Sequence, residues 1–162
     1  MAKAKPRAKK KKVIFVCTGN TCRSPMAEAI FREFLRKKRK LSLFEVSSAG
    51  LAAEEGAPMT ENALKALATL QVQVKKPHKA KQLTVAAAEK ADFIVTMTAS
   101  HKQALGAYAV KAKSIGELTG GHDVPDPYGG DEELYLKTAK YLSYAAEDVF
   151  SFVNAAGEGA NA

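Results

Sequence analysis

The chain has 162 residues and a mass of 17.3 kDa, which suits a single domain with a buried core. Hydrophobic residues make up 46% and charged residues 26%, a composition that excludes wholesale disorder, collagen and a coiled coil. No apolar run approaches the roughly 18 residues of a membrane-spanning helix. The N-terminus lacks the apolar region of a secretory signal, and two cysteines exclude a disulfide scaffold. We therefore expect a cytoplasmic protein.

The net charge of +8 is concentrated at the N-terminus. Seven of the 25 basic residues lie within residues 3–12, which leaves 18 basic residues against 17 acidic ones elsewhere. Such a segment has too few apolar side chains to offset its ordering entropy. We therefore expect a disordered basic arm over residues 1–12, a near-neutral domain over residues 13–154 and a frayed end over residues 155–162. Only the arm has the charge to attract polyanions, and we expect no nucleic-acid binding beyond weak contacts there.

Strands and helices are predicted to alternate along the chain. The apolar run at residues 13–16 predicts a strand buried on both faces. Ser24 and Pro25 predict a helix with Ser24 as its N-cap, and basic residues at 36–40 are typical of its C-terminal end. Further strands are predicted at residues 43–47, 92–98 and, more weakly, 110–115. Further helices are predicted at residues 60–70 with Thr60 as N-cap, 83–90, 100–105 and from about residue 131 onward.

The last helix is predicted to bury the face formed by Leu134, Thr138, Leu142, Ala145, Val149 and Val153. A turn-rich loop is predicted before it, at residues 119–130. Alternating strands and helices imply right-handed crossovers between parallel strands. The predicted fold is therefore α/β, with a single doubly wound, four-stranded parallel sheet and helices on both faces.

Residues 17–25 form the segment most typical of a functional site. A strand, a loop of small residues and a helix start together favour phosphate, because loop amides and the positive helix end attract anions. The segment lacks the glycine spacing and the Lys-Ser/Thr pair of a P-loop nucleotide site. It has Cys17 at its start, where the surroundings favour a thiolate, and Arg23, which can hold two phosphoryl oxygens. The spacing alone also fits a small buried cysteine.

The full string is Cys17-Thr18-Gly19-Asn20-Thr21-Cys22-Arg23-Ser24-Pro25, and it resembles the low-molecular-weight protein tyrosine phosphatase family. The resemblance extends from residue 13 to the last helix, and it implies the phosphotyrosine phosphatase I-like form of the predicted fold. It implies that Cys17 is the nucleophile and Arg23 the phosphate clamp. It also implies that Asn20, which tolerates a left-handed backbone, bonds to Ser24, Ser48 and His78, and that Ser24 donates to the thiolate. The substrate-binding residues implied are Thr18, Gly19, Asn20, Thr21, Cys22, Ser24 and Tyr128.

Asp126 lies in the downstream segment 123–130. Asp and Pro are ordinary turn residues, but the family has its general acid in an Asp-Pro-aromatic loop, and the resemblance therefore implies that role for Asp126. After attack by Cys17 the leaving atom must be protonated, and the same carboxylate can then activate water against a phosphocysteine intermediate. Tyr128 is expected to form one wall of the entrance.

Thr21 bears on the choice of substrate. The tyrosine phosphatases that the chain resembles usually have an aliphatic residue at this position, whereas the bacterial protein-arginine phosphatases have threonine. A hydroxyl can meet a guanidinium that an aliphatic side chain would desolvate, although a threonine used only for its branched shape is the alternative. The single aromatic Tyr128 also favours the arginine branch. Phosphoarginine is therefore the expected substrate, and phosphotyrosine is the alternative.

Cys22 is either an inert buried thiol or, as the resemblance implies, a resolving cysteine that forms a reversible disulfide with oxidised Cys17. Arsenate reductases of this scaffold use further cysteines, of which the chain has none after Cys22. His101 and His122 have no partner at metal-ligand spacing, so we interpret both as surface or loop residues.

We expect no metal and no cofactor, because amides and Arg23 supply charge stabilisation. We expect a monomer whose partners are phosphorylated proteins or peptides. We expect no association with a membrane. A non-enzymatic module that binds nucleic acid through the arm is the remaining alternative.

Overall fold

The computed structural model describes residues 9–159, with side chains described up to residue 154. Its four strands are all parallel and form one sheet in the order β2-β1-β3-β4. They are β1 (Lys11–Cys17), β2 (Phe44–Gly50), β3 (Phe93–Thr96) and β4 (Ala112–Ser114). The predicted α/β fold with a four-stranded parallel sheet is confirmed. Because the chain turns from one side of β1 to the other, the carboxyl ends of β1 and β3 flank the crevice in which such sheets bind ligands.

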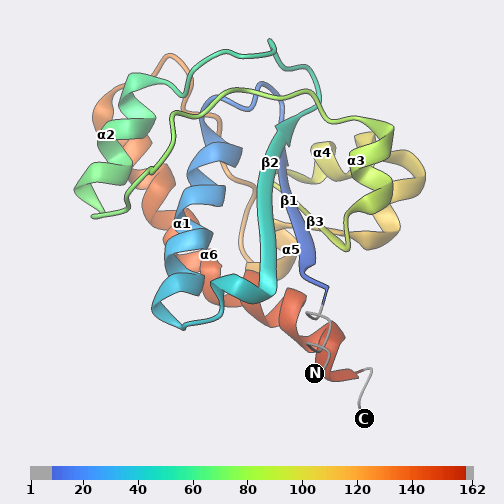
Figure 1. Ribbon diagram of the computed structural model, residues 1–162. Helices are drawn as coiled ribbons and strands as arrows, with labels where there is room; N and C mark the ends of the chain where they lie inside the picture. The colour runs from blue at the N-terminus through green and yellow to red at the C-terminus, as the bar shows by residue number, and fades with distance from the viewer. Residues whose placement is uncertain (1–8, 160–162) are drawn as a thin grey trace, which may run out of the picture.

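Helices cover both faces of the sheet, as Figure 1 shows for α1, α2 and α6 on one side and α3 and α4 on the other. The first group contains α1 (Arg23–Lys37), α2 (Glu61–Thr69), α5 (Ile115–Thr119) and α6 (Glu132–Gly159). The second contains α3 (Val85–Lys90), α4 (Ala99–Ala104) and the 3-10 helix η2 (Gly106–Lys111), while η1 (Leu41–Leu43) leads into β2. Among the described residues, every helix is too short or too polar to cross a bilayer.

Strand β1 lies at the centre of the sheet and is buried on both faces. Val13 and Phe15 pack into the core beneath α1 and α6, whereas Ile14 and Val16 pack into the smaller core beneath α3 and η2. A central parallel strand has no solvent-facing side, which explains its uninterrupted apolar run.

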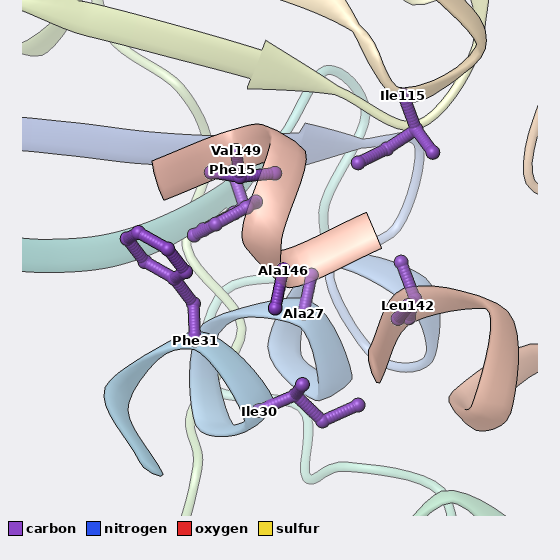
Figure 2. Close-up of a pocket in the computed structure, with 8 residues that line it drawn as sticks. All are labelled: Phe15, Ala27, Ile30, Phe31, Ile115, Leu142, Ala146 and Val149. Atoms are coloured by element: carbon purple, nitrogen blue, oxygen red, sulfur yellow. The ribbon is translucent and has the colours of Figure 1, made fainter. Parts of the chain in front are cut away.

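The larger core contains one small void between β1, α1 and α6, shown in Figure 2. Its volume is about 10 Å³, which is room for at most one water molecule. The lining side chains are all apolar: Phe15, Ala27, Ile30, Phe31, Ile115, Leu142, Ala146 and Val149. This void is therefore a packing defect, and it offers nothing to hold a substrate.

The start of β1 corrects the predicted boundary of the basic arm. The strand begins at Lys11, and the Lys12 N–H donates to the Asp92 carboxylate at 2.8 Å. Lys12 Nζ lies 3.9 Å from Glu45 Oε2. Lys11 and Lys12 thus belong to the sheet, because backbone pairing at a strand end tolerates long charged side chains that reach solvent. Residues 1–8 of the predicted arm lie outside the described residues.

The N-cap of α1 also differs from the prediction. Cys22 holds the N-cap position, and Ser24 and Pro25 lie inside the first turn. Proline fits there because the N–H groups of the first turn have no intrahelical partner. The Ser24 hydroxyl is within hydrogen-bond distance of Cys17 Sγ, at 2.8 Å. The side chain that the local pattern assigns to helix capping therefore makes a tertiary contact instead.

In α6 the predicted buried face is correct except at its start. Leu134 is 36% exposed and packs beside Gly130 of the preceding loop, and Tyr135 is buried in its place. The helical backbone continues to Gly159, five residues into the predicted frayed end. Residues 160–162 lie outside the described part of the chain.

The remaining elements occur near their predicted positions with shifted ends. Strand β2 begins at Phe44 and continues to Gly50, beyond the predicted end at residue 47. Strand β4 is shorter than predicted, since residues 110 and 111 belong to η2 and Ile115 starts α5. Helix α5 was not predicted, although Ser114 and Glu117 form the capping box that signals it. Thr60 precedes α2 as predicted, but its side chain makes no capping bond.

Candidate active site

The loop from β1 to α1 turns its carbonyl groups outward. The carbonyls of Cys17, Thr18, Asn20 and Thr21 accept hydrogen bonds from the Leu51 N–H (3.0 Å), the Ala52 N–H (2.9 Å), His78 Nε2 (2.7 Å) and the Thr60 N–H (3.0 Å), respectively. In a trans peptide the C=O and the next N–H point in opposite directions. The N–H groups of Thr18, Gly19, Thr21 and Cys22 therefore point into the loop. Convergent amides at the start of a helix form a concave site for an anion.

Gly50 lets β2 approach this loop. A Cβ at Gly50 would lie 2.5 Å from the Thr18 carbonyl oxygen, closer than packed atoms allow, and in tight contact with the Asn20 nitrogen at 3.1 Å. Only glycine therefore permits the hydrogen bonds from Leu51 and Ala52 to the loop. Sequence reasoning missed this residue, whose signal is a glycine three residues after the predicted strand, at what proves to be the last residue of β2.

Asn20 is fully buried at the centre of the loop, with a left-handed φ of 58°. Its Oδ1 accepts a hydrogen bond from the Lys81 N–H at 2.9 Å, which fixes the orientation of the amide. Asn20 Nδ2 must then donate to both Ser24 Oγ (2.8 Å) and Ser48 Oγ (3.0 Å). The structure thus brings these predicted residues into one network.

The direction of this network determines what reaches Cys17. Since Ser24 Oγ accepts from Asn20, its own proton is left for Cys17 Sγ at 2.8 Å rather than the distant Ala49 carbonyl at 3.5 Å. The Asn20 N–H also donates to Cys17 Sγ at 3.3 Å. Cys17 is buried, and two donors directed at its sulfur stabilise a thiolate.

Glu28 extends the network away from the loop. Ser48 Oγ donates to Glu28 Oε1 at 2.8 Å, and Arg32 Nε lies 3.3 Å from Glu28 Oε2. An ionised carboxylate only accepts, so Glu28 fixes the hydroxyl proton of Ser48 and leaves the Ser48 oxygen free to accept from Asn20. Sequence reasoning missed Glu28, because a helical glutamate one turn after Ser24 looks like any surface residue.

Arg23 connects the loop to the segment that contains Asp126. Its side chain is 7% exposed, with Nη1 donating to the Val124 carbonyl at 3.1 Å and Nη2 lying 3.6 Å from Asp126 Oδ2. The Asp126 side chain is 57% exposed and accepts the Tyr128 N–H at 3.1 Å. Tyr128 itself is 74% exposed beside it. The two segments that the sequence separates by about a hundred residues therefore meet at one end of the sheet.

Cys22 points into a separate polar cluster. Its Sγ lies 3.3 Å from Tyr135 Oη, 3.6 Å from Thr60 Oγ1 and 3.7 Å from Thr21 Oγ1. Burial, and then the hydrogen bond with Cys22, raise the pKa of Tyr135 to about 12. Cys17 and Cys22 are both free thiols. Thr21 is half-buried, and its carbonyl is tied to the Thr60 N–H.

His101 corrects the sequence prediction, while His122 is the exposed loop residue that the sequence predicted. His101 is only 7% exposed, and its Nε2 lies 2.9 Å from Thr18 Oγ1. Burial, and then the positive charge of Arg23, lower the pKa of His101, against the opposing influence of Asp123 and Asp126. The prediction failed because α4 follows β3 and the parallel pairing of β1 with β3 brings both carboxyl ends together. Among the described side chains, which end at residue 154, no cluster of metal-binding groups occurs.

The fold and the loop define a class of protein: an α/β protein with a cysteine beneath an amide-lined anion site at the end of its central strand. The family model described as "Low molecular weight phosphotyrosine protein phosphatase" matches residues 12–158. The chain belongs to this family, and it is a protein phosphatase of the hydrolase class.

Its relatives include phosphatases for two kinds of phosphorylated residue. The protein-arginine-phosphatase of Bacillus subtilis is 40% identical over 136 residues, covering 80% of this chain and 88% of the relative. The low molecular weight protein tyrosine phosphatase from T. tengcongensis has a solved structure with a TM-score of 0.80 and 39% identity, covering 88% of this chain and 99% of that one. A cysteine-to-serine mutant of the arginine phosphatase YwlE with a phosphorylated active-site serine has a TM-score of 0.77 and 36% identity, covering 85% and 92%.

The lowered pKa of His101 makes the stability of the protein depend on pH. The unfolded chain binds a proton to this residue near the usual value of 6.5, whereas the folded protein resists protonation until a lower pH. The unfolded state thus binds more protons just below pH 6.5, and the free energy of unfolding falls as the pH is lowered there. Urea unfolding at pH 7.5 and 5.5 should show a larger decrease for the wild type than for His101→Gln. Equal decreases would contradict the lowered pKa.

Proposed function

We propose that this phosphatase is metal-independent, works through a phosphocysteine intermediate on Cys17 and acts on phosphoarginine in proteins. The observation that carries the proposal is the surroundings of the Cys17 sulfur. The Asn20 N–H and the Ser24 hydroxyl converge on it, and four loop amides point into the space that a phosphoryl group would occupy. The phosphorylated active-site serine of the YwlE mutant supports covalent transfer at this position.

The first step transfers the phosphoryl group to sulfur. The Cys17 thiolate attacks phosphorus, an S–P bond forms, and the bond from phosphorus to the leaving nitrogen breaks. Asp126 gives its proton to that nitrogen. The arginine side chain therefore does not have to leave as a guanidine anion. The loop amides and Arg23 hold the equatorial oxygens while charge redistributes. Arg23 retains donors for this task, because its bonds in the structure use only part of a guanidinium with five N–H groups.

The second step restores the enzyme. Asp126, now a carboxylate, takes a proton from water while the water oxygen attacks phosphorus. The S–P bond breaks, inorganic phosphate forms, and Cys17 is again a thiolate stabilised by Ser24 and Asn20. The position of Asp126 suits both steps, since its exposed carboxylate lies 3.6 Å from the clamp arginine Arg23.

Specificity for phosphoarginine is proposed to depend on Thr21. Its half-buried side chain places the hydroxyl 3.7 Å from Cys22 Sγ, and the B. subtilis relative of 40% identity is a protein-arginine-phosphatase. A guanidinium has N–H donors that need acceptors as it enters a partly dry site, whereas a phenyl ring has none. The exposed ring of Tyr128 can form a wall of the entrance for either substrate.

Replacing the nucleophile separates binding from chemistry. Cys17→Ser should abolish turnover of p-nitrophenyl phosphate in the presence of a metal chelator, because a serine hydroxyl in this position is not ionised. Calorimetric titration should show that phosphate binding is partly retained, since the loop amides and Arg23 are unchanged. Activity like that of the wild type would refute the proposed nucleophile.

Replacing the general acid should give a loss that depends on the leaving group. Asp126→Ala should lower kcat by about 100-fold or more on substrates with poor leaving groups. The loss should be smaller on p-nitrophenyl phosphate, whose nitrophenolate leaves with little need of a proton. The measurement is kcat on both substrates for both proteins, and losses of equal size would remove Asp126 from the acid role.

Two substitutions at one position separate the hydroxyl of Thr21 from its shape. Thr21→Val keeps the branched shape and removes the hydroxyl, so it should lower kcat/KM on phosphoarginine peptides by roughly 10- to 100-fold. Thr21→Ile should do the same, while activity on phosphotyrosine peptides holds or rises in both. Full phosphoarginine activity of Thr21→Val would contradict the hydroxyl argument, and a wild type that prefers phosphotyrosine would support the tyrosine alternative.

A further inference from the structure

His101 links two strand ends that the sequence keeps far apart. It lies in α4, directly after β3, while Thr18 follows Cys17 at the end of β1. The contact of 2.9 Å between His101 Nε2 and Thr18 Oγ1 spans 83 positions of the chain. The His101 side chain is buried, and the proposed chemistry does not use it. A polar side chain in this place needs an explanation, because burial of an imidazole costs hydration.

The second ring nitrogen indicates which tautomer is present. His101 Nδ1 is buried and has no hydrogen-bond partner. If Nδ1 carried the proton, the protein would bury an N–H donor without an acceptor, which is rarer than an acceptor without a donor. The proton therefore belongs on Nε2, and His101 donates to Thr18 Oγ1. The direction of the bond is fixed, and the hydroxyl proton of Thr18 is directed elsewhere.

Thr18 is held at both ends by groups outside the loop. Its carbonyl accepts the Ala52 N–H at 2.9 Å, and its side chain is held by His101. The Thr18 carbonyl fixes the direction of the Gly19 N–H, as the Cys17 carbonyl does for the Thr18 N–H. The hydrogen bond from His101 holds the Thr18 side chain, and with it the residue that joins these two peptide planes. The Thr18 and Gly19 amides are the first two amides of the proposed anion site, directly after the nucleophile Cys17.

We propose that neutral His101 is a positioning residue, which holds the Thr18 and Gly19 amides in their phosphate-binding orientation through its Nε2–H bond to Thr18. The inference rests on the proposed function, because it concerns the same loop. His101 lies across the crevice from the loop, in α4. Its loss is expected to weaken phosphate binding although no group that contacts phosphate is removed.

The charges around His101 are consistent with a neutral ring. Arg23 faces it with a positive charge, and Asp123 and Asp126 face it with negative charges that only partly compensate for burial and Arg23. Protonation would place an N–H at the buried Nδ1, where no acceptor is present. The neutral ring also leaves Arg23 as the principal positive side chain of the site, so His101 orients the loop without competing for the anion.

The test compares variants that keep or remove the donor. His101→Leu should raise the inhibition constant of inorganic phosphate by about 3- to 10-fold, the scale of one hydrogen bond. His101→Gln, which can present an amide N–H at similar reach, should stay within about 2-fold of the wild type. Gln103→Leu, an exposed polar residue on the same helix, is the matched control and should leave the constant unchanged.

A double variant shows whether His101 acts through Thr18. Thr18→Val removes the partner, and the combination with His101→Leu should be no worse than the more impaired single variant. Additive losses, or an unchanged phosphate constant in His101→Leu, would overturn the proposal. Turnover could still be abolished by Cys17→Ser in that case, so failure here is distinguishable from failure of the proposed function.

The tautomer can be measured without any substitution. Nitrogen-15 NMR of the wild type at neutral pH should show His101 protonated at Nε2 and bare at Nδ1. A proton on Nδ1 would overturn the proposal even if His101→Leu failed to fold.

Discussion

The amide-lined loop depends on the hydrogen bonds that its carbonyls make outside it. A tight loop in which several N–H groups converge must direct its carbonyls to the opposite side, and each buried carbonyl needs a donor. Leu51, Ala52, His78 and Thr60 supply those donors from three other segments of the chain. The anion site is therefore formed by the surrounding structure as much as by the loop itself.

This requirement explains several features around the sheet. Gly50 has no side chain because β2 must come close enough for the next two N–H groups to reach the loop. Asn20 adopts a left-handed backbone and fills the loop with an amide, whose orientation is fixed by Lys81. Because that amide can only donate toward Ser24 and Ser48, the polarity of the whole network follows, and it ends with a donor at the Cys17 sulfur.

The sequence predicted the residues of the site better than their connections. Cys17 and Arg23 could be singled out because a cysteine and an arginine separated by five residues in a loop between a buried strand and a helix have few chemical uses together, whereas Asp126 was implied only by the family resemblance. Ser24 was assigned to capping because local pattern cannot reveal that Cys17 lies within reach. Glu28 was missed and His101 misplaced for the same reason, since their partners, Ser48 in β2 and Thr18 in the loop after β1, lie in other segments of the chain.

The sequence by itself determined the alternation of strands and helices and the central buried strand, and it led to the prediction of an anion site at residues 17–25. These depend on short-range chemistry: apolar runs, a proline in a first helical turn and small residues between a strand and a helix. Only the tertiary structure decided which groups complete the site, because parallel strands align ends that lie far apart in the chain. The contact of Arg23 with Asp126 and that of His101 with Thr18 both arise in this way, at the carboxyl end of the sheet, where the loop after β1 meets α4 and the loop between α5 and α6.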